Sequence, residues 1–310
     1  MREAVEKINL VIVAGPTAAG KTELAVRLAG RFDGEIVNAD SMQLYRGMEI
    51  GTAKPSPEVR RMVPHHLLDV LEPDQPFSAS DFRQEAMKVI ADIHRRGKRV
   101  FVAGGTGLYI KALLHGLVDS PGGDEALREE LEEVARTRGN EALLRQLAEV
   151  DPESARRLHP NDRVRIIRAL EVYHLSGSPI SRFRSEHAFG GDYYQVLKFG
   201  IRVEREELYN RINRRVERML EDGLVEEVRA LMARGFDSGA KTMRAIGYKE
   251  IYAFLTGDCT LDETVRLIKQ NTRHYAKRQE TWFKREPEII WVEYPRDFDN
   301  ICGHVMEFYG

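Results

Sequence analysis

The chain has 310 residues, which is long enough for one large α/β domain or two smaller domains with a substantial hydrophobic core. Hydrophobic residues make up 42% and charged residues 31% of the sequence, a balance that excludes a disordered or fibrous protein. The formal net charge of −2 excludes a protein that is basic all over, although it allows local basic patches.

The first predicted elements are a strand at residues 9–14, a glycine-rich loop and a helix from Lys21. The loop reads GPTAAGKT and satisfies the pattern G-x-x-x-x-G-K-[ST] between a strand and a helix. Its glycines let the backbone wrap phosphate oxygens, Lys21 can neutralise their charge, and the Thr22 hydroxyl can ligate Mg²⁺. We therefore expect a phosphate site formed by Gly15, Pro16, Thr17, Ala18, Ala19, Gly20, Lys21 and Thr22.

Further strands are predicted at residues 35–39 and 99–103, with a second helix near Ser80. The stretch Ser78-Ala79-Ser80-Asp81 fits a capping box and supports that helix start. Strands that alternate with helices are typical of βαβ units, which build parallel sheets. Together with the phosphate loop, this order predicts an α/β fold with a P-loop NTPase-like core and a parallel sheet.

An acid, Asp40, follows the second predicted strand in the segment IVNADSMQLY. P-loop NTPases usually carry an acid at the end of another core strand to hold Mg²⁺, but strand 99–103 leads into the segment GGTG (104–107). Asp40 lies at the carboxyl end of its strand, where α/β sheets bind ligands, so it can contact an acceptor substrate. Two structural alternatives remain open: Asp40 as a helix N-cap, and GGTG as a turn that opens a helix.

The character of the sequence changes after Gly116. Residues 121–176 are charged and helical in pattern, whereas strand-like sequence returns at 194–203 and 289–292, separated by long helical patterns at 206–219 and 264–284. We therefore predict that residues 1–117 and 196–310 form the core and that residues 118–195 form a mostly helical insertion domain.

Two helical patterns concentrate positive charge. The longer run has basic residues at helical spacing near the C-terminus: Arg266, Lys269, Arg273, Lys277 and Lys284. The shorter run lies in the insertion and consists of Arg163, Arg165 and Arg168. Either run alone is typical of a solvated face, but two runs in a nearly neutral chain favour a polyanionic partner. In the segment RINRRV (211–216), an arginine is a candidate clamp for a leaving pyrophosphate.

The two cysteines, Cys259 and Cys302, show no spacing typical of a metal site, so we expect reduced thiols. No apolar run approaches the roughly 20 residues that span a bilayer, and the N-terminal apolar run leads into the phosphate loop rather than a cleavage site. These observations predict a cytoplasmic protein with no membrane contact. No obligate protein partner is evident from the sequence.

These blocks together resemble one family, the tRNA dimethylallyltransferases. The resemblance covers almost the whole chain in order, through GPTAAGKT (15–22), NADSMQLYRGMEIGTAKP (38–55), PHHLLDV (64–70), FSASDFR (77–83), GGTGLYIKALL (104–114), NDRVRIIRALEV (161–172), RINRRVERML (211–220), IGYKE (246–250) and TRHYAKRQETWFKR (272–285). It implies transfer of a dimethylallyl group from its pyrophosphate to the N6 amine of the adenosine beside the anticodon, in tRNAs that read codons beginning with U.

The resemblance also implies roles for individual residues. Asp40 matches the catalytic acid, Thr17 and Arg215 would act on the leaving pyrophosphate with Arg211 as second choice, and Thr22 would hold Mg²⁺. The partner would be the tRNA anticodon stem-loop, whose target base must leave the stack. The residues implied at the tRNA are Asp40, Ser41, Met42, Gln43, Thr106, Arg165, Arg168, Arg273, Lys277 and Arg278.

The sequence departs from the family at two places. Eukaryotic relatives often carry a C-terminal zinc finger whose ligands are missing here, so the chain resembles the shorter bacterial form. Val164 stands where some bacterial relatives carry a glutamine, which puts an RNA contact by that side chain in doubt. Two other functions stay open from the residues alone: a P-loop kinase of a small metabolite, and a non-catalytic RNA-binding P-loop protein in which Asp40 is only a cap.

Overall fold

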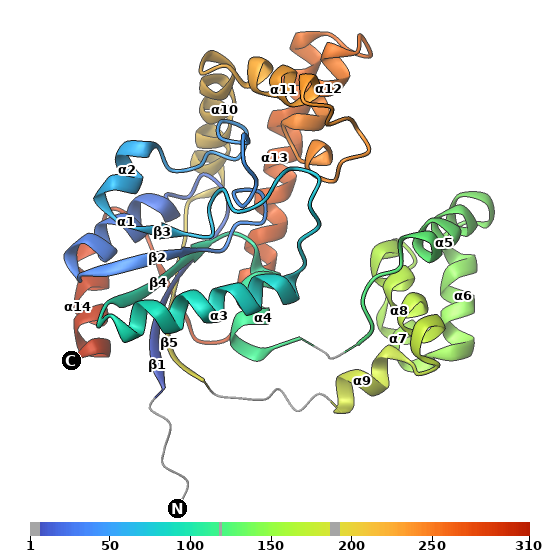
Figure 1. Cartoon of the computed structure of the whole chain (residues 1–310), viewed down its shortest axis with the longest axis horizontal. Coiled ribbons are helices and arrows are strands. Elements are labelled where there is room, and N and C mark those ends of the chain that lie inside the picture. The colour runs from blue at the N-terminus through green and yellow to red at the C-terminus, as the bar shows by residue number, and fades with distance from the viewer. Residues whose placement is uncertain (1–6, 118–119, 187–192) are drawn as a thin grey trace, which may run out of the picture. The chain divides into compact units, whose positions relative to one another are not determined.

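The computed structural model describes residues 7–117, 120–186 and 193–310 (Figure 1). The chain divides into two compact units, one made of Met1–Leu114 with Asp192–Gly310 and the other of His115–Gly191. The insertion predicted at 118–195 therefore corresponds to a unit whose boundaries lie three and four residues earlier. Each unit has its own hydrophobic core.

A six-stranded, all-parallel sheet forms the centre of the first unit, which confirms the predicted fold class. Its strand order is β3-β2-β4-β1-β5-β6. The strands are β1 (Ile8–Ala14), β2 (Gly34–Asn38), β3 (His65–His66), β4 (Arg99–Gly104), β5 (Tyr194–Ile201) and β6 (Ile289–Val292). All but the two-residue β3 were predicted, with ends shifted by at most two residues.

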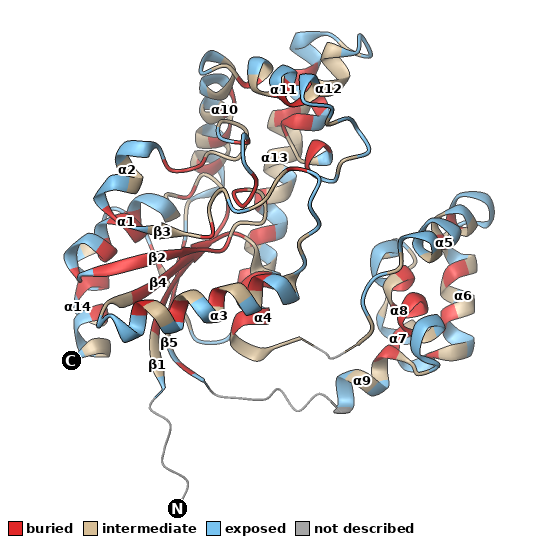
Figure 2. Ribbon diagram, in the orientation of Figure 1, coloured by how far each residue is buried: buried red, intermediate tan, exposed pale blue. Residues whose placement is uncertain are grey.

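Both faces of the sheet are covered, as a parallel sheet requires. Along β1, Leu10 and Ile12 belong to one buried cluster and Val11 and Val13 to the other, because successive side chains point to opposite faces. Helices within residues 79–115 and 205–283 supply the first cluster, and helices within residues 21–31 and 298–309 supply the second. Figure 2 shows β2 and β4 buried along their lengths.

The helices begin and end close to the local signals in the sequence. Ser78 and Asp81 form the predicted capping box: the Asp81 amide donates to Ser78 Oγ (3.2 Å) and the Ser78 amide to Asp81 Oδ2 (2.8 Å). In the first unit the helices are α1 (Lys21–Arg31), α2 (Pro57–Met62), α3 (Ala79–Arg95), α4 (Gly107–His115), α10 (Arg205–Glu221), α11 (Leu224–Ala233), α12 (Tyr248–Leu255), α13 (Leu261–Phe283) and α14 (Phe298–Tyr309). None of the described helices has the length and apolarity to cross a bilayer.

The second unit is helical, as its sequence predicted. It contains α5 (Glu125–Arg138), α6 (Asn140–Val150), α7 (Pro152–Arg157), α8 (Arg163–Ser176) and α9 (Ile180–Glu186). Leu131, Leu143, Ile166 and Leu170 are among the buried residues of its core. Glycine and proline mark the ends of these helices: Gly139 lies between α5 and α6, and Pro152 is the first residue of α7.

Arg165 and Arg168, which the spacing places in one basic run, have different environments in the structure. The Glu171 side chain is 0% exposed, so its carboxylate requires counter-charges, which Arg128 and Arg168 provide. Arg168 also donates to Ser120 Oγ (3.1 Å) and to the carbonyls of Pro121 (2.6 Å) and Gly122 (3.2 Å). The guanidinium of Arg168 therefore holds its own unit together, whereas the exposed Arg165 only pairs with Asp162 at 3.5 Å.

Candidate active site

The phosphate loop joins β1 to α1 in a conformation that depends on glycine. Gly20, at the N-terminus of α1, has a φ of 99°. This left-handed conformation is sterically unfavourable for any residue that has a Cβ atom, so glycine is the residue that suits it. The Lys21 ammonium folds back over the loop and donates to the Pro16 carbonyl (2.7 Å). The loop therefore curls around the end of α1, where backbone amides and the helix dipole favour an anion.

Strand register brings the other predicted segments beside this loop. Ala14 of β1 is aligned with Gly104 of β4, and Asn38 of β2 with Ala103, so the three strands end together. The Thr106 amide donates to the Ala39 carbonyl (3.1 Å) and the Ser41 amide to Thr106 Oγ1 (3.0 Å). Residues far apart in the sequence therefore form one edge, as expected for the carboxyl ends of parallel strands.

Asp40 stands on this edge, and it does not cap a helix. The segment after it forms turns, and Asp40 Oδ1 accepts a hydrogen bond from the Met42 amide (2.9 Å). That bond orients the carboxylate, while Oδ2 accepts no hydrogen bond from the described residues. The segment GGTG does lead into a helix, α4, which confirms the structural interpretation of these glycines. The same segment also lies at the edge that carries Asp40.

A cavity of about 1130 Å³ lies in front of these elements, which exceeds the roughly 300–1,000 Å³ of ordinary small-molecule sites. Its lining includes Thr17, Ala18, Gly20, Lys21, Thr22, Asp40, Gln43, Arg211, Arg214, Arg215 and Arg218. Six other predicted site residues belong to the same unit but do not line the cavity: Ser41, Met42, Thr106, Arg273, Lys277 and Arg278. The structure thus brings the predicted anion loop, the acid and the arginine helix to one cavity.

The charges around this cavity influence one another. Burial lowers the pKa of Lys21 to about 8; Asp40 opposes this shift and Arg215 adds to it. Burial also lowers the pKa of Arg215, again opposed by Asp40. The pKa of Tyr275 on α13 is raised mainly by burial and further by the charge of Asp40. The cavity is lined by seven Lys and Arg side chains and four acidic ones, an excess of positive charge that a bound anion would neutralise.

The arginines of α10 are not equivalent. Glu207 accepts a hydrogen bond from Arg211 Nε (2.7 Å) and lies 3.5 Å from Arg214. Arg215 is half-buried at the cavity, and it forms no ion pair with an acid among the described residues. Of the three arginines in the segment RINRRV, Arg215 is therefore the one that pairs with no acid of the described residues, which favours it over Arg211 as an anion ligand. Arg218, further along α10, also lines the cavity and has no ion pair among the described residues.

The segment between Gln43 and Pro55 forms another wall of the cavity. Gln43 is buried, and its Nε2 donates to the carbonyls of Thr52 (3.0 Å) and Ala53 (3.3 Å). Glu227 of α11 accepts hydrogen bonds from three successive amides, at 2.8, 2.8 and 3.0 Å, in residues 49–51. Side chains of Gln43 and Glu227 thus hold this wall in place. Gln43 therefore has a structural role, whether or not it also contacts a substrate.

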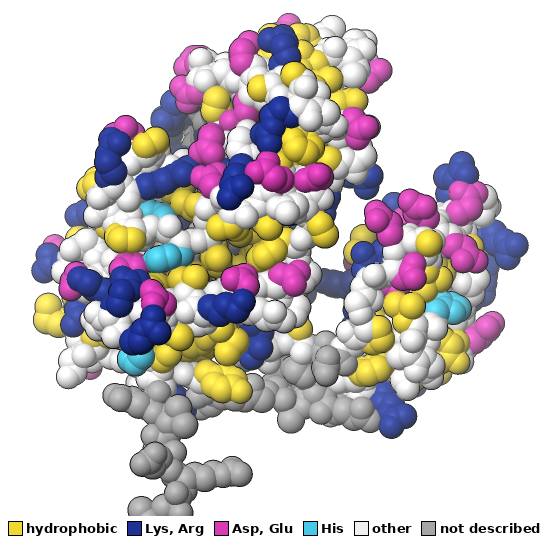
Figure 3. Space-filling view, viewed as in Figure 1, with side chains coloured by type: hydrophobic (Ala, Val, Ile, Leu, Met, Phe, Trp, Pro, Cys, Tyr) yellow, Lys and Arg dark blue, Asp and Glu magenta, His cyan; other side chains and the backbone are white. Residues whose placement is uncertain are grey.

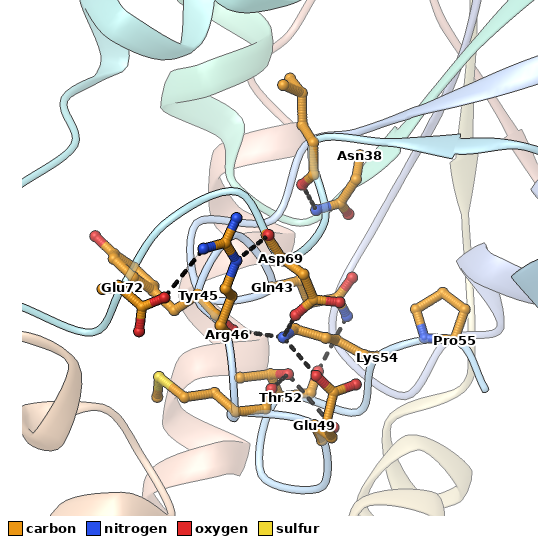
Figure 4. A network of polar contacts seen from close by, with 12 residues as sticks. Asn38, Gln43, Tyr45, Arg46, Glu49, Thr52, Lys54, Pro55, Asp69 and Glu72 are labelled. Atoms are coloured by element: carbon orange, nitrogen blue, oxygen red, sulfur yellow. Dashed lines mark hydrogen bonds and ion pairs between the residues drawn. The ribbon is translucent and has the colours of Figure 1, made fainter. Parts of the chain in front are cut away.

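Lys54 anchors the same wall from within (Figure 4). Its side chain is 0% exposed, and its ammonium contacts the Tyr45 carbonyl, Asp69 and, at 3.0 Å, Glu49. Without this ammonium the Tyr45 carbonyl loses its partner. Among the described residues, Glu49 and Asp69 then keep only Arg60, which pairs with them at 2.7 and 2.6 Å. A buried acceptor left without a partner costs about 1–3 kcal/mol, so we expect Lys54→Met to lower the free energy of unfolding by about 2 kcal/mol, measured by urea denaturation.

A matched control is Lys88→Met, which breaks the pair between Lys88 and Glu85 (2.6 Å), two side chains that are 69% and 45% exposed. An exposed ion pair contributes at most about 1 kcal/mol to stability, so Lys88→Met should leave the free energy of unfolding nearly unchanged. Equal losses in the two variants would contradict a stabilising function for the buried ammonium.

Some of the basic side chains of α13 make contacts within the protein. Arg273 donates to Asn213 (2.8 Å) and lies over the ring of Tyr209, and Lys269 pairs with Glu217 of α10. These contacts arise because α13 packs along α10, which the sequence of α13 alone does not reveal. Lys277 and Arg278 remain exposed. On the face shown in Figure 3, acidic and basic side chains are mixed rather than separated by sign.

One residue that the sequence did not single out reaches the phosphate loop. Gln279 of α13 is buried, and its Oε1 accepts a hydrogen bond from the Thr17 amide (2.8 Å). Its Nε2 donates to the Gly105 carbonyl (2.9 Å). Its position inside the block TRHYAKRQETWFKR was the only available signal, because a lone glutamine on a helix predicts no contact.

Comparisons with known proteins identify the family of this chain. A family model described as IPP transferase matches residues 43–286. The chain is 66% identical to "tRNA dimethylallyltransferase 2" of Geotalea uraniireducens over 100% of both chains, and 58% identical to "tRNA dimethylallyltransferase" of Geobacter sulfurreducens over 99% of both. The crystal structure of the full-length tRNA isopentenylpyrophosphate transferase from Bacillus halodurans matches with a TM-score of 0.72 and 42% identity, covering 97% of each chain. A eukaryotic dimethylallyltransferase acting on tRNA matches with a TM-score of 0.77 and 29% identity, over 96% of this chain and 77% of that one. This chain belongs to the IPP transferase family.

Proposed function

We propose that this protein transfers a dimethylallyl group from dimethylallyl diphosphate to the N6 amine of the adenosine on the 3′ side of the anticodon in tRNA. The acceptors would be tRNAs that read codons beginning with U, and the location would be the cytoplasm. The observation that carries the proposal is one cavity that joins a phosphate loop, Arg215 and the carboxylate of Asp40.

The reaction joins the N6 nitrogen to the first carbon of the allylic group. The bond between that carbon and the diphosphate oxygen breaks, and its electron pair leaves with the diphosphate. Lys21, Arg215 and the Thr17 hydroxyl stabilise the growing charge, because fixed donors in a site of low dielectric act strongly on developing anions. Asp40 accepts the proton that N6 loses, which is general base catalysis at an otherwise weak nucleophile.

The acceptor reaches this cavity only if its base leaves the anticodon-loop stack. Base extrusion of this kind costs a few kcal/mol, and least in a single-stranded loop. In our proposal the anticodon stem-loop contacts Asp40, Ser41, Met42, Gln43 and Thr106 around the base, and Lys277 and Arg278 through its phosphates. Arg165 belongs to the helical unit and is the exposed candidate there.

Mg²⁺ would accompany the diphosphate. The described residues contain no cluster of three His, Cys, Asp or Glu that could hold a metal by itself. Thr22 lines the cavity at the start of α1, and Mg²⁺ often takes only one or two protein ligands besides phosphate oxygens and water. The residues present therefore fit an ion that arrives with its substrate, and the ion would supply charge neutralisation of the leaving group.

The test is incubation with labelled dimethylallyl diphosphate and an unmodified tRNA transcript. We expect label in the tRNA and none when the target adenosine is replaced by guanosine, which lacks the N6 amine. A parallel incubation with ATP addresses the kinase alternative, and direct RNA binding addresses the non-catalytic one. ATP consumption without label transfer, or RNA binding without either reaction, would refute the proposal.

The lowered pKa of Lys21 predicts a pH dependence of diphosphate binding. Only the ammonium form attracts the anion, so this contribution is present below pH 8 and is lost as the pH rises above it. We expect the affinity for pyrophosphate, relative to that of Lys21→Arg, to fall about tenfold between pH 7 and pH 9. Calorimetric titration measures both proteins, and the arginine variant corrects for the titration of the ligand. A constant ratio would contradict the assignment.

The exposed cations of α13 predict a salt effect on tRNA binding. Replacing both Lys277 and Arg278 by alanine should reduce the slope of log K against log salt by about two, because each cation that no longer neutralises a phosphate lowers it by about one. Fluorescence anisotropy with labelled tRNA over a range of salt concentrations measures the slope, with Lys88→Ala on α3 as the control. An unchanged slope would make these residues ordinary solvated surface.

A further inference from the structure

Gln279 connects two loops that flank the Lys21 ammonium. It lies on α13, 262 residues from Thr17 and 174 from Gly105, and its side chain amide bonds to both. A methyl group built on Gly105 would lie 2.1 Å from Gln279 Nε2 and 3.5 Å from Lys21 Nζ. The amide of Gln279 is therefore next to the Lys21 ammonium, at the place where a diphosphate would bind.

The two hydrogen bonds fix the orientation of this amide. Oε1 must face the Thr17 N–H and Nε2 must face the Gly105 carbonyl, so a flipped amide would break both bonds. Gln279 is only 6% exposed, which leaves no solvent to replace these partners. The hydrogen bond also occupies the Thr17 N–H, so Thr17 has its hydroxyl, rather than its amide, to offer a phosphate.

We propose that Gln279 is a positioning residue for prenyl transfer. It holds the Thr17 backbone and the Gly105 turn at a fixed separation, and this separation sets where the Thr17 hydroxyl and the Lys21 ammonium meet the diphosphate. The inference rests on the proposed function. Displacement of reacting groups by about 1 Å can reduce a rate about a hundredfold, so a bridge of this kind matters although it touches no substrate.

The first test replaces Gln279 by methionine, which has a similar size but neither amide group. We expect kcat/KM for dimethylallyl diphosphate to fall about 10- to 100-fold and pyrophosphate affinity about tenfold, with tRNA affinity within twofold of wild type. The control is Gln270→Met, a half-buried glutamine on the same helix that makes no hydrogen bond in the described part of the chain. A general loss of structure would weaken tRNA binding as well, which separates it from a positioning effect.

The second test uses the close approach of Gly105. Gly105→Ala places a methyl group against Gln279 Nε2 and must displace the amide, so we expect it to lower pyrophosphate affinity about tenfold. In a Gln279→Ala background that methyl group has room, and the same change should then cost less than about twofold. This pair of variants does not depend on whether Gln279→Met folds well.

The outcomes distinguish the two proposals. If wild type transfers no label, the proposed function fails, while pyrophosphate binding still reports on Gln279. If Gln279→Met binds pyrophosphate and turns over like wild type, or if the losses from Gly105→Ala and Gln279→Ala simply multiply, Gln279 is not a positioning residue.

Discussion

Asp40→Asn should reduce the rate of prenyl transfer by about 10²- to 10⁴-fold, the range that a general base contributes. The amide has the same shape and can keep the hydrogen bond from the Met42 amide, so the loop should not rearrange. It cannot take the N6 proton, and the exocyclic amine of adenine is a poor nucleophile while it keeps that proton. Single-turnover measurement with labelled donor and saturating tRNA reports the rate of the chemical step.

Asp222→Asn is the control for this change. Asp222 also lines the cavity, at the end of α10. Unlike Asp40, it does not contribute to the pKa shifts of Lys21 and Arg215. Its substitution should alter the rate less than about threefold, within the range of an ordinary surface charge. Affinity for tRNA should be unchanged in both variants. Near-normal turnover by Asp40→Asn would remove this carboxylate from the chemistry.

Arg215→Met should lower kcat by about 10²- to 10³-fold, because it removes a donor aimed at the departing diphosphate. The change keeps much of the apolar stem of the side chain, so the packing of α10 should survive. Arg215→Lys should recover part of the rate, since a point charge replaces the bidentate guanidinium. Steady-state kinetics with varied dimethylallyl diphosphate measure all three proteins.

Arg211→Met gives the comparison within the same helix. Arg211 is already paired with Glu207, so its removal should cost no more than about fivefold, the value of an exposed ion pair. A larger effect at Arg211 than at Arg215 would reverse the assignment and indicate that Glu207 releases its partner when the donor binds.

The features that the sequence predicted correctly have local physical causes. An apolar run of β length, a glycine loop before a helix and a capping box each depend on residues within a few positions of one another. The ends of β1, β2 and β4 therefore fell within two residues of their predicted positions, and the phosphate loop could be recognised from eight letters. The proximity of Asp40 to this loop followed from one further rule, that parallel strands bind ligands at their carboxyl ends.

The features that the sequence could not show depend on partners far away along the chain. Nothing near Arg168 or Arg273 in the sequence indicates that they contact the buried Glu171 and the neighbouring helix α10. The burial of Lys54 has no signal in the sequence for the same reason, since acids of two loops enclose its ammonium. A charged side chain is neutralised by whatever the fold brings to it, and periodicity along one helix contains no information about that.

The site shows the same division. The eight-residue phosphate loop carries its own conformation, since glycine and the start of α1 impose it locally. The packing of α10 and α13 on the sheet decides which arginines of α10 lie at the cavity without an acidic partner among the described residues. It also decides that Gln279 of α13 ties Thr17 to Gly105. Packing is a property of many weak contacts between distant segments, so the choice among chemically similar side chains is made only when the whole core assembles.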